Sequence, residues 1–144
     1  MPNNTHMDLE LIEKAKQATE TSYSPYSHFK VGAAVRMSDG RVFTGSNQEN
    51  AAYSACLCAE RVALLYACAN AGESYPMSIA IAAYTDGKFT ENVITPCGEC
   101  CQVLVEMEKR FGHEITIYLY GEKEVKTLKS AMELLPYAFE LGNS

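Results

Sequence analysis

The spacing of hydrophobic and polar positions in the first third of the chain predicts a helix followed by a β-hairpin. Apolar residues recur with a helical period over residues 11–19, and Asp8 stands before them as a candidate N-cap. Over residues 30–37 the apolar side chains at odd-numbered positions, from Val31 to Met37, alternate strictly with a second set at even-numbered positions. A tight turn at Asp39-Gly40 leads into residues 41–46. This alternation is typical of a β-hairpin.

The middle of the chain predicts a buried helix and a buried strand. Residues 59–71 are apolar nearly all round, which is typical of a buried helix, and Gly72 is placed to end it. The short apolar run 77–84 fits an interior strand, and turn residues 85–88 lead the chain out of it.

The last third predicts two helices around one strand and completes the fold class. Thr95 as N-cap and Pro96 at the first helical position predict a helix that runs to about Phe111. Residues 115–120 alternate as a strand, and a last short helix is expected over residues 128–135. The predicted order, α-β-β-α-β-α-β-α with room for one more short strand, favours an α/β fold in which helices cover both faces of a mixed sheet.

Length and composition fit one compact domain. The chain has 144 residues, 47% of them hydrophobic, so we expect a single domain over residues 1–144 with a disordered tail at residues 1–7. The net charge of -6, without a dense Lys/Arg cluster, argues against nucleic acid as a partner. No apolar run has membrane-spanning length, and the N-terminus lacks the features of a signal peptide, so we expect a cytoplasmic protein without membrane contact.

Six cysteines in such a chain indicate metal binding or catalysis rather than a disulfide framework. Cys58 and Cys97 stand where predicted helices begin, and the exposed N–H groups there favour thiolates. Cys97 and Cys100 are three positions apart on one helix, so both sulfurs can reach one tetrahedral ion, and Cys58 completes three ligands. Cys101, four positions after Cys97, lies on the same face and is an alternative to Cys100. A fourth position left to water makes such a site catalytic.

Two side chains close to Cys58 in the sequence suit a catalytic zinc. Glu60 lies in the same first helical turn, where we expect it close to the metal water without being a ligand, which is the position of a proton shuttle. A Cys or His, a non-ligating Glu and a Pro-Cys-x-x-Cys run form the pattern of zinc deaminases. Arg61, three residues beyond Cys58, is hypothesised to donate to the sulfurs and to offset the net charge of three thiolates on a divalent ion.

These residues also have plainer interpretations. For the cysteines, the main one is a structural zinc knuckle with Cys56 or Cys101 as fourth ligand. Glu60 argues against it, although a first-turn Glu also stabilises a helix dipole. Cys56 and Cys68 are expected to be packing residues without a further role, and Arg61 would by default lie on a solvated helix face.

Five segments together resemble the small homotetrameric cytidine deaminases, in order and over nearly the whole chain. They are 26–34 (YSHFKVGAA), 45–53 (GSNQENAAY), 58–61 (CAER), 96–100 (PCGEC) and 134–136 (LLP). The resemblance implies a three-layer α/β/α sandwich with a five-stranded mixed β-sheet and a homotetramer with shared active sites. It also implies one Zn²⁺ per subunit, held by Cys58, Cys97 and Cys100. Cys101 departs from the family, which usually has Arg at that position.

The resemblance further implies a set of substrate contacts. Asn47 and Glu49 correspond to the pair that hydrogen-bonds the ribose hydroxyls, a role that suits an amide and a carboxylate two positions apart at the end of a strand. Phe29 corresponds to the aromatic residue of the pyrimidine pocket, and Phe139 and Tyr53 to residues offered across subunit interfaces. Without the motifs, the polar pair would be turn or capping residues and the phenylalanines core residues. The implied substrate-binding set is Phe29, Asn47, Glu49, Tyr53, Ala59 and Phe139.

The expected activity is zinc-dependent hydrolytic deamination of cytidine or 2′-deoxycytidine to uridine or 2′-deoxyuridine plus ammonia, in pyrimidine salvage. Activated water attacks C4 while Glu60 protonates N3 and then the leaving amine. A deaminase of a cytosine-bearing antibiotic such as blasticidin S would share the zinc centre and is the enzymatic alternative, although Asn47 and Glu49 favour a ribose. A non-catalytic, zinc-stabilised binding module is the other alternative.

Overall fold

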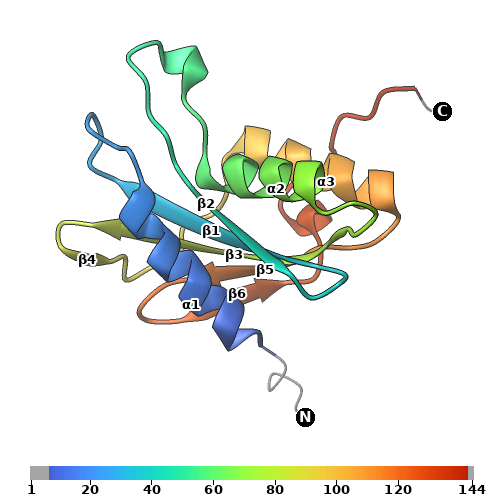
Figure 1. The fold of residues 1–144 in the computed structure, drawn as a ribbon, viewed down its shortest axis with the longest axis horizontal. Helices are drawn as coiled ribbons and strands as arrows, with labels where there is room; N and C mark the ends of the chain where they lie inside the picture. The colour runs from blue at the N-terminus through green and yellow to red at the C-terminus, as the bar shows by residue number, and fades with distance from the viewer. Residues whose placement is uncertain (1–6, 143–144) are drawn as a thin grey trace.

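The computed structural model describes residues 7–142, and over this range helices and strands alternate along most of the chain (Figure 1). The helices are α1 (Leu9–Ala18), α2 (Ala59–Asn70) and α3 (Gly98–Phe111). The strands are β1 (Lys30–Met37), β2 (Val42–Ser46), β3 (Pro76–Thr85), β4 (Lys88–Phe89), β5 (Thr116–Tyr120) and β6 (Val125–Leu128). Short 3₁₀ helices span Thr19–Thr21, Tyr53–Ala55 and Ala131–Glu133. No helix over residues 7–142 has the length and apolar character needed to cross a bilayer.

The strands form one mixed sheet in the order β2-β1-β3-β5-β6. β3 and β5 run parallel, while the other neighbours on this path are antiparallel. The predicted five-stranded mixed sheet is confirmed, and the two-residue β4 pairs with β3 as a short sixth strand. The α/β/α sandwich is confirmed too, because α1 covers one face of the sheet and α2 and α3 cover the other (Figure 1).

Neighbouring residues of β1 point into two separate cores. Val35 belongs to the larger core under α2 and α3, whereas Ala34 belongs to the smaller core under α1. Side chains alternate along a strand, so a strand buried on both faces has an almost continuous apolar sequence. Gly32 lets α1 approach the sheet closely, since a Cβ there would lie 2.2 Å from the carbonyl oxygen of Ala15.

Two helix boundaries lie where the sequence predicts them. The Asp8 side chain caps α1 by accepting a hydrogen bond of 3.1 Å from the backbone N–H of Leu11. Gly72 takes a positive φ of 64° just after the end of α2, a conformation that glycine adopts at low cost. The predicted disordered tail falls outside the described residues except for Met7, which packs partly buried against the core under α1.

The predicted start of the third helix at Thr95-Pro96 is wrong. α3 begins at Gly98, and Cys97 is its N-cap with an extended backbone at φ -70° and ψ 170°. The Cys97 carbonyl accepts the first helical bond, from the N–H of Cys101 at 2.9 Å. Proline fits the extended approach to a helix as well as its first turn. Because α3 starts later than predicted, the Cys97 side chain lies at the N-terminal end of the helix.

The predicted helix over residues 128–135 is also wrong. Residues 125–128 form β6, whose backbone pairs with β5, and only a single 3₁₀ turn follows at Ala131–Glu133. The Glu108 carboxylate holds this turn by accepting hydrogen bonds from the Ala131 N–H at 2.9 Å and the Ser130 hydroxyl at 2.8 Å. These long-range bonds replace the helical ones that local sequence favoured.

Candidate active site

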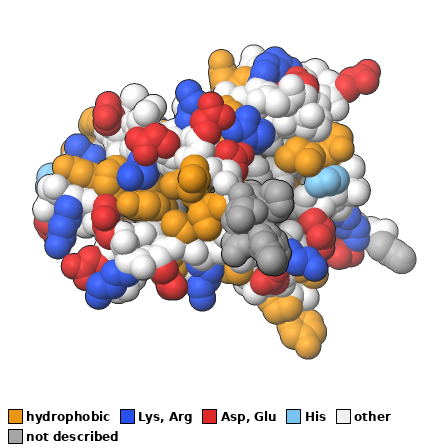
Figure 2. Space-filling model, turned by 90° about the horizontal axis from the view of Figure 1, so that it is seen from below, with side chains coloured by type: hydrophobic (Ala, Val, Ile, Leu, Met, Phe, Trp, Pro, Cys, Tyr) orange, Lys and Arg blue, Asp and Glu red, His pale blue; other side chains and the backbone are white. Residues whose placement is uncertain are grey.

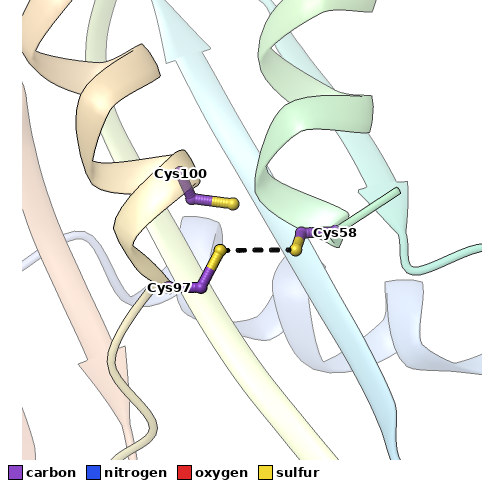
Figure 3. Close-up of side chains that lie close together, drawn as sticks. All are labelled: Cys58, Cys97 and Cys100. Atoms are coloured by element: carbon purple, nitrogen blue, oxygen red, sulfur yellow. Dashed lines mark hydrogen bonds between the residues drawn. The ribbon is translucent and has the colours of Figure 1, made fainter. Parts of the chain in front are cut away.

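Two of the three predicted zinc ligands occupy equivalent positions on different helices. Cys58 is the N-cap of α2 and Cys97 is the N-cap of α3, and neither side chain makes a capping hydrogen bond. Their Sγ atoms lie 3.7 Å apart (Figure 3). The Cys100 sulfur, one turn into α3, joins them, and all three sulfurs lie within 4.8 Å of one another.

This arrangement fits a tetrahedral zinc ion. Zinc–sulfur bonds of about 2.3 Å at tetrahedral angles place the sulfurs of one ion about 3.8 Å apart. The Cys58–Cys97 separation of 3.7 Å meets that requirement. Both N-cap cysteines also face free backbone N–H groups, which favour the thiolate that a metal needs.

Proton sharing among the sulfurs places negative charge on Cys58. The Cys100 thiol donates toward the Cys58 sulfur and, together with Arg61 and against the effect of burial, lowers the pKa of Cys58 to about 5. Arg61 Nη2 lies 3.7 Å from that sulfur. The same contact with Cys58, together with burial, raises the pKa of Cys100. The cluster is therefore an anionic site suited to a cation.

The remaining cysteines have other partners. Cys101 is buried, and its sulfur is directed to the carbonyl oxygen of Pro96 at 3.6 Å rather than to the cluster. Cys56 contacts the Asn50 carbonyl oxygen at 3.6 Å, and the Cys68 sulfur lies 4.0 Å from the sulfur of a methionine on α3. Over the described residues, none of these three belongs to the group that could hold a metal.

Glu60 is a buried carboxyl group beside the sulfurs. It lies in the first turn of α2 and is 5% exposed. Burial, together with the negative charge of Cys58, raises the pKa of Glu60 to about 7. A carboxyl group with a pKa near 7 both gives and takes protons at neutral pH, as general acid–base catalysis requires.

A cavity of about 420 Å³ is lined by two of the three cluster cysteines, by Glu60 and by the predicted polar pair, whereas Cys100 is not among its described lining residues. This volume is in the range of small-ligand sites. Of the residues predicted from the sequence, the cavity is lined by Asn47, Glu49, Tyr53, Cys58, Ala59, Glu60 and Cys97. The wall also contains residues to which the sequence analysis assigned no role in the site, namely Leu57, Ile94 and Thr95, and Tyr26 and Val31 from the segment 26–34 that carries part of the resemblance.

Asn47 is held by three neighbours. Its Oδ1 accepts hydrogen bonds from the Ser22 hydroxyl and, at 2.9 Å, from the Val31 N–H. Its Nδ2 donates to the Phe29 carbonyl oxygen at 2.8 Å. These bonds occupy both lone pairs of the oxygen and one of the two N–H groups, so the remaining capacity of Asn47 is one donor.

Glu49 organises the loop before β1. It accepts hydrogen bonds from the Tyr26 N–H at 3.0 Å, the Ser27 N–H at 3.2 Å and the Ser27 hydroxyl. The Ser27 hydroxyl bond lowers the pKa of Glu49, so its carboxylate is ionised at neutral pH. Lone pairs not used by these donors remain available as acceptors.

The two predicted phenylalanines lie elsewhere. Phe29 is half-buried in the loop before β1, and Phe139 is 68% exposed near the C-terminal end, with its carbonyl oxygen accepting from Gln102. Neither is among the described residues that line the cavity. Their roles stay predictions.

Arg61 is not a solvated residue of the helix face, since its side chain is only 19% exposed. The guanidinium lies between Cys58 on α2 and Glu99 on α3. Sequence reasoning identified the first contact and missed the second, because the ion pair with Glu99 forms only when the two helices pack.

A purely structural zinc site has no use for a buried carboxyl group and an open cavity beside the ion. The fold and the site together therefore indicate a zinc-dependent hydrolytic deaminase.

Comparison with known proteins defines the family. Residues 5–112 match a family model described as the cytidine and deoxycytidylate deaminase zinc-binding region.

Relatives of known identity match along almost their whole length. The chain is 39% identical over 134 residues to the cytidine deaminase of Sporosarcina psychrophila, covering 92% of each chain. It is 41% identical over 129 residues to that of Halalkalibacterium halodurans, covering 90% of this chain and 91% of the relative. The crystal structure of cytidine deaminase from Burkholderia pseudomallei matches with a TM-score of 0.78 and 44% identity, covering 92% of this chain and 99% of that one. The chain belongs to the cytidine and deoxycytidylate deaminase family, whose characteristic region binds zinc.

Proposed function

We propose that the protein deaminates cytidine or 2′-deoxycytidine hydrolytically, giving uridine or 2′-deoxyuridine and ammonia. The observation that carries this proposal is a cluster of three cysteine sulfurs, two of which belong to residues that line one cavity together with the buried Glu60. The relatives named as cytidine deaminases support the same substrate class. In the cell, this activity belongs to pyrimidine salvage in the cytoplasm.

Cys58, Cys97 and Cys100 would hold the zinc ion. Zinc bound there supplies Lewis-acid activation of water near neutral pH. Arg61 donates to the Cys58 sulfur and offsets part of the negative charge that three thiolates leave on the site. The three cysteine side chains already face one another in the protein (Figure 3).

Glu60 is the residue that moves protons. Its buried carboxyl group, with a pKa of about 7, takes a proton from the attacking water and delivers it to N3 of the pyrimidine. It then takes the second proton, from the hydroxyl group that is now on C4, and delivers it to the amine, which leaves as ammonia while C4 becomes a carbonyl. Burial away from bulk water favours the neutral acid, so the carboxyl group holds each of the two protons until it is transferred.

Asn47 and Glu49 suit a sugar hydroxyl as a matched pair. Asn47 has one free N–H donor, and the ionised Glu49 has free acceptor capacity. A hydroxyl group accepts from the first and donates to the second, and a bare cytosine base has no such group in that place. Ala59, the first residue of α2, adds a backbone N–H without an intrahelical acceptor.

Tyr53 and Phe139 are proposed to act between subunits of a homotetramer. Tyr53 lines the cavity yet is 85% exposed, and Phe139 is 68% exposed. Large aromatic side chains with this exposure are typical of interfaces. A neighbouring copy that covers the cavity would exclude water and supply the aromatic wall, with Phe29 as the residue of the same subunit.

The proposal is tested by metal analysis and by the ultraviolet change on incubation with cytidine, 2′-deoxycytidine, cytosine and blasticidin S. We expect zinc in the purified protein and turnover of the two nucleosides. Glu60→Gln should retain zinc and lose several orders of magnitude in rate, because the carboxyl group is the proton carrier. Turnover of blasticidin S alone would assign the antibiotic instead, and zinc without any turnover would leave a binding module. Sedimentation of the same sample tests the tetramer.

A further inference from the structure

A single guanidinium nitrogen connects the metal cluster to an acidic residue that no motif explains. Nη2 of Arg61 lies 3.7 Å from the Cys58 sulfur and 3.2 Å from Oε1 of Glu99. Its neighbour Nε is buried and has no hydrogen-bond partner among the described residues. The contacts that hold the Arg61 side chain in place are therefore made by its Nη atoms and not by Nε.

In the sequence, Glu99 lies between Cys97 and Cys100, two of the three cysteines of the metal cluster. It occupies the first turn of α3, after Cys97 and before Cys100, while Arg61 occupies the first turn of α2. The ion pair therefore joins the two helix starts that carry the metal cluster. The only basic residues of α3, Lys109 and Arg110, stand in its last turn, so the positive charge near the sulfurs comes from α2.

The contacts of Arg61 differ in how well they fix its position. The Cys58 sulfur carries negative charge and Arg61 also donates toward the Cys100 sulfur, but sulfur is a large and diffuse acceptor and the contact of 3.7 Å with Cys58 is long. The Glu99 oxygen comes closer, at 3.2 Å, and a carboxylate matches the planar guanidinium, which favours one orientation of this long side chain with large rotamer entropy. Although Glu99 is 77% exposed, Arg61 is 19% exposed, so this pair is less screened than one wholly at the surface.

We propose that Glu99 is a positioning residue that holds the Arg61 guanidinium against the Cys58 sulfur and thereby helps the site to retain zinc. This inference rests on the proposed zinc centre and adds a residue to it. Partners that orient metal-binding groups commonly affect metal affinity about 10- to 100-fold when removed. Because Glu99 acts through Arg61, its removal should have a smaller effect than removal of Arg61.

The experiment measures how fast the zinc-loaded protein transfers zinc to an excess of a chelating dye at one fixed pH. Glu99→Ala should release zinc about three- to tenfold faster than the unmodified chain, and Arg61→Ala faster still. The double variant should release zinc no faster than Arg61→Ala alone. Glu106→Ala, which removes an exposed carboxylate from the same helix, is the matched control and should behave like the unmodified chain.

The double variant separates positioning from a general effect of a carboxylate on the start of α3. If Glu99 acted only on the helix dipole, its removal would speed zinc release equally with and without Arg61, and the proposal would be overturned. Unchanged release in Glu99→Ala would overturn it as well. Glu99→Gln, which keeps an acceptor without the charge, serves if Glu99→Ala does not fold, and should show a smaller change in the same direction. Failure of the zinc centre itself would already appear in the unmodified protein.

A charge effect elsewhere on the surface would not depend on Arg61 either. Figure 2 shows acidic and basic side chains interspersed over the face of the molecule that it displays. Removal of any one charge therefore changes the electrostatic background of the whole surface as well as the field at the site. The comparison with Glu106→Ala, measured at the same ionic strength, removes this background.

Discussion

The sulfur atoms of Cys58 and Cys97 lie 3.7 Å apart although the residues are 39 positions apart in the sequence. Each is the N-cap of its own helix, and neither uses its sulfur for capping. Zinc binding therefore depends on the packing of α2 against α3, and each helix alone carries an incomplete site.

The identity of the third ligand is tested by comparing Cys100→Ser with Cys101→Ser. Cys100 faces the other two sulfurs, whereas the Cys101 sulfur is directed to the Pro96 carbonyl oxygen. We expect Cys100→Ser to lose most of its zinc and Cys101→Ser to keep it. Metal analysis after dialysis against a mild chelator measures both. Loss of zinc in Cys101→Ser with retention in Cys100→Ser would exchange the two assignments.

Removal of zinc should expose a pH dependence that originates at Glu60. Burial raises the pKa of Glu60 from 4.5 to about 7, so between these values the folded protein binds more protons than the unfolded chain. The free energy of unfolding of the metal-free protein should therefore fall as the pH rises through this window, by roughly 3 kcal/mol in total.

Urea unfolding of the metal-free protein near pH 5 and near pH 8 measures this effect. Glu60→Gln, which cannot titrate, should lose less stability between the two conditions than the unmodified chain. The cysteines titrate in both proteins, so the difference between them isolates Glu60. An equal loss in both would show that the carboxyl group is not buried in its neutral form.

Ser22 should influence substrate binding through Asn47. The Ser22 hydroxyl donates to Asn47 Oδ1, one of the bonds that set the direction of the free N–H group of the amide. In Ser22→Ala we expect KM for cytidine to rise about three- to tenfold while kcat changes less, since the lost bond is worth about 1 kcal/mol. Steady-state kinetics measure both constants. Ser38→Ala, in the turn between β1 and β2, is the control, and equal KM values in the two variants would contradict the role of Ser22.

Asp8 should stabilise the fold in a pH-dependent way. Burial alone would raise the pKa of Asp8, but hydrogen bonds from Arg36 and Leu11 outweigh it and hold this pKa below the usual 3.8. Its stabilising contribution is thus present above about pH 4 and is lost as the pH falls through the lowered value. Asp8→Asn keeps the cap of α1 and removes the charge.

We expect Asp8→Asn to lower the free energy of unfolding by about 1 kcal/mol at neutral pH. The difference from the unmodified chain should close as the solution is acidified below pH 3.8. Denaturant unfolding at several pH values measures it. A difference that stays constant with pH would mean that the Arg36 contact contributes through packing rather than charge.

Most elements of the fold follow from local patterns. The cap at Asp8, the β-hairpin and the end of α2 at Gly72 depend on neighbouring residues, and the structure has them as predicted. The two wrong predictions have separate causes. Pro96 fits the extended chain before α3 as well as a first helical turn, so local sequence did not fix the start of this helix. The residues after β6 are held by a distant group, the Glu108 carboxylate, which accepts from the Ala131 N–H.

The sequence by itself determined the order of the main helices and strands as far as β5, apart from the two-residue β4, together with the chemical type of the metal ligands and the carboxyl group close to Cys58 in the chain. Periodicity and residue chemistry are local properties, so they can be interpreted without knowledge of how the chain packs. Only the tertiary structure decided that Cys100 rather than Cys101 faces Cys58, that Glu60 is buried and that Arg61 reaches Glu99. Each of these depends on the approach of α2 to α3, and the distance between two helices is set by the whole core beneath them.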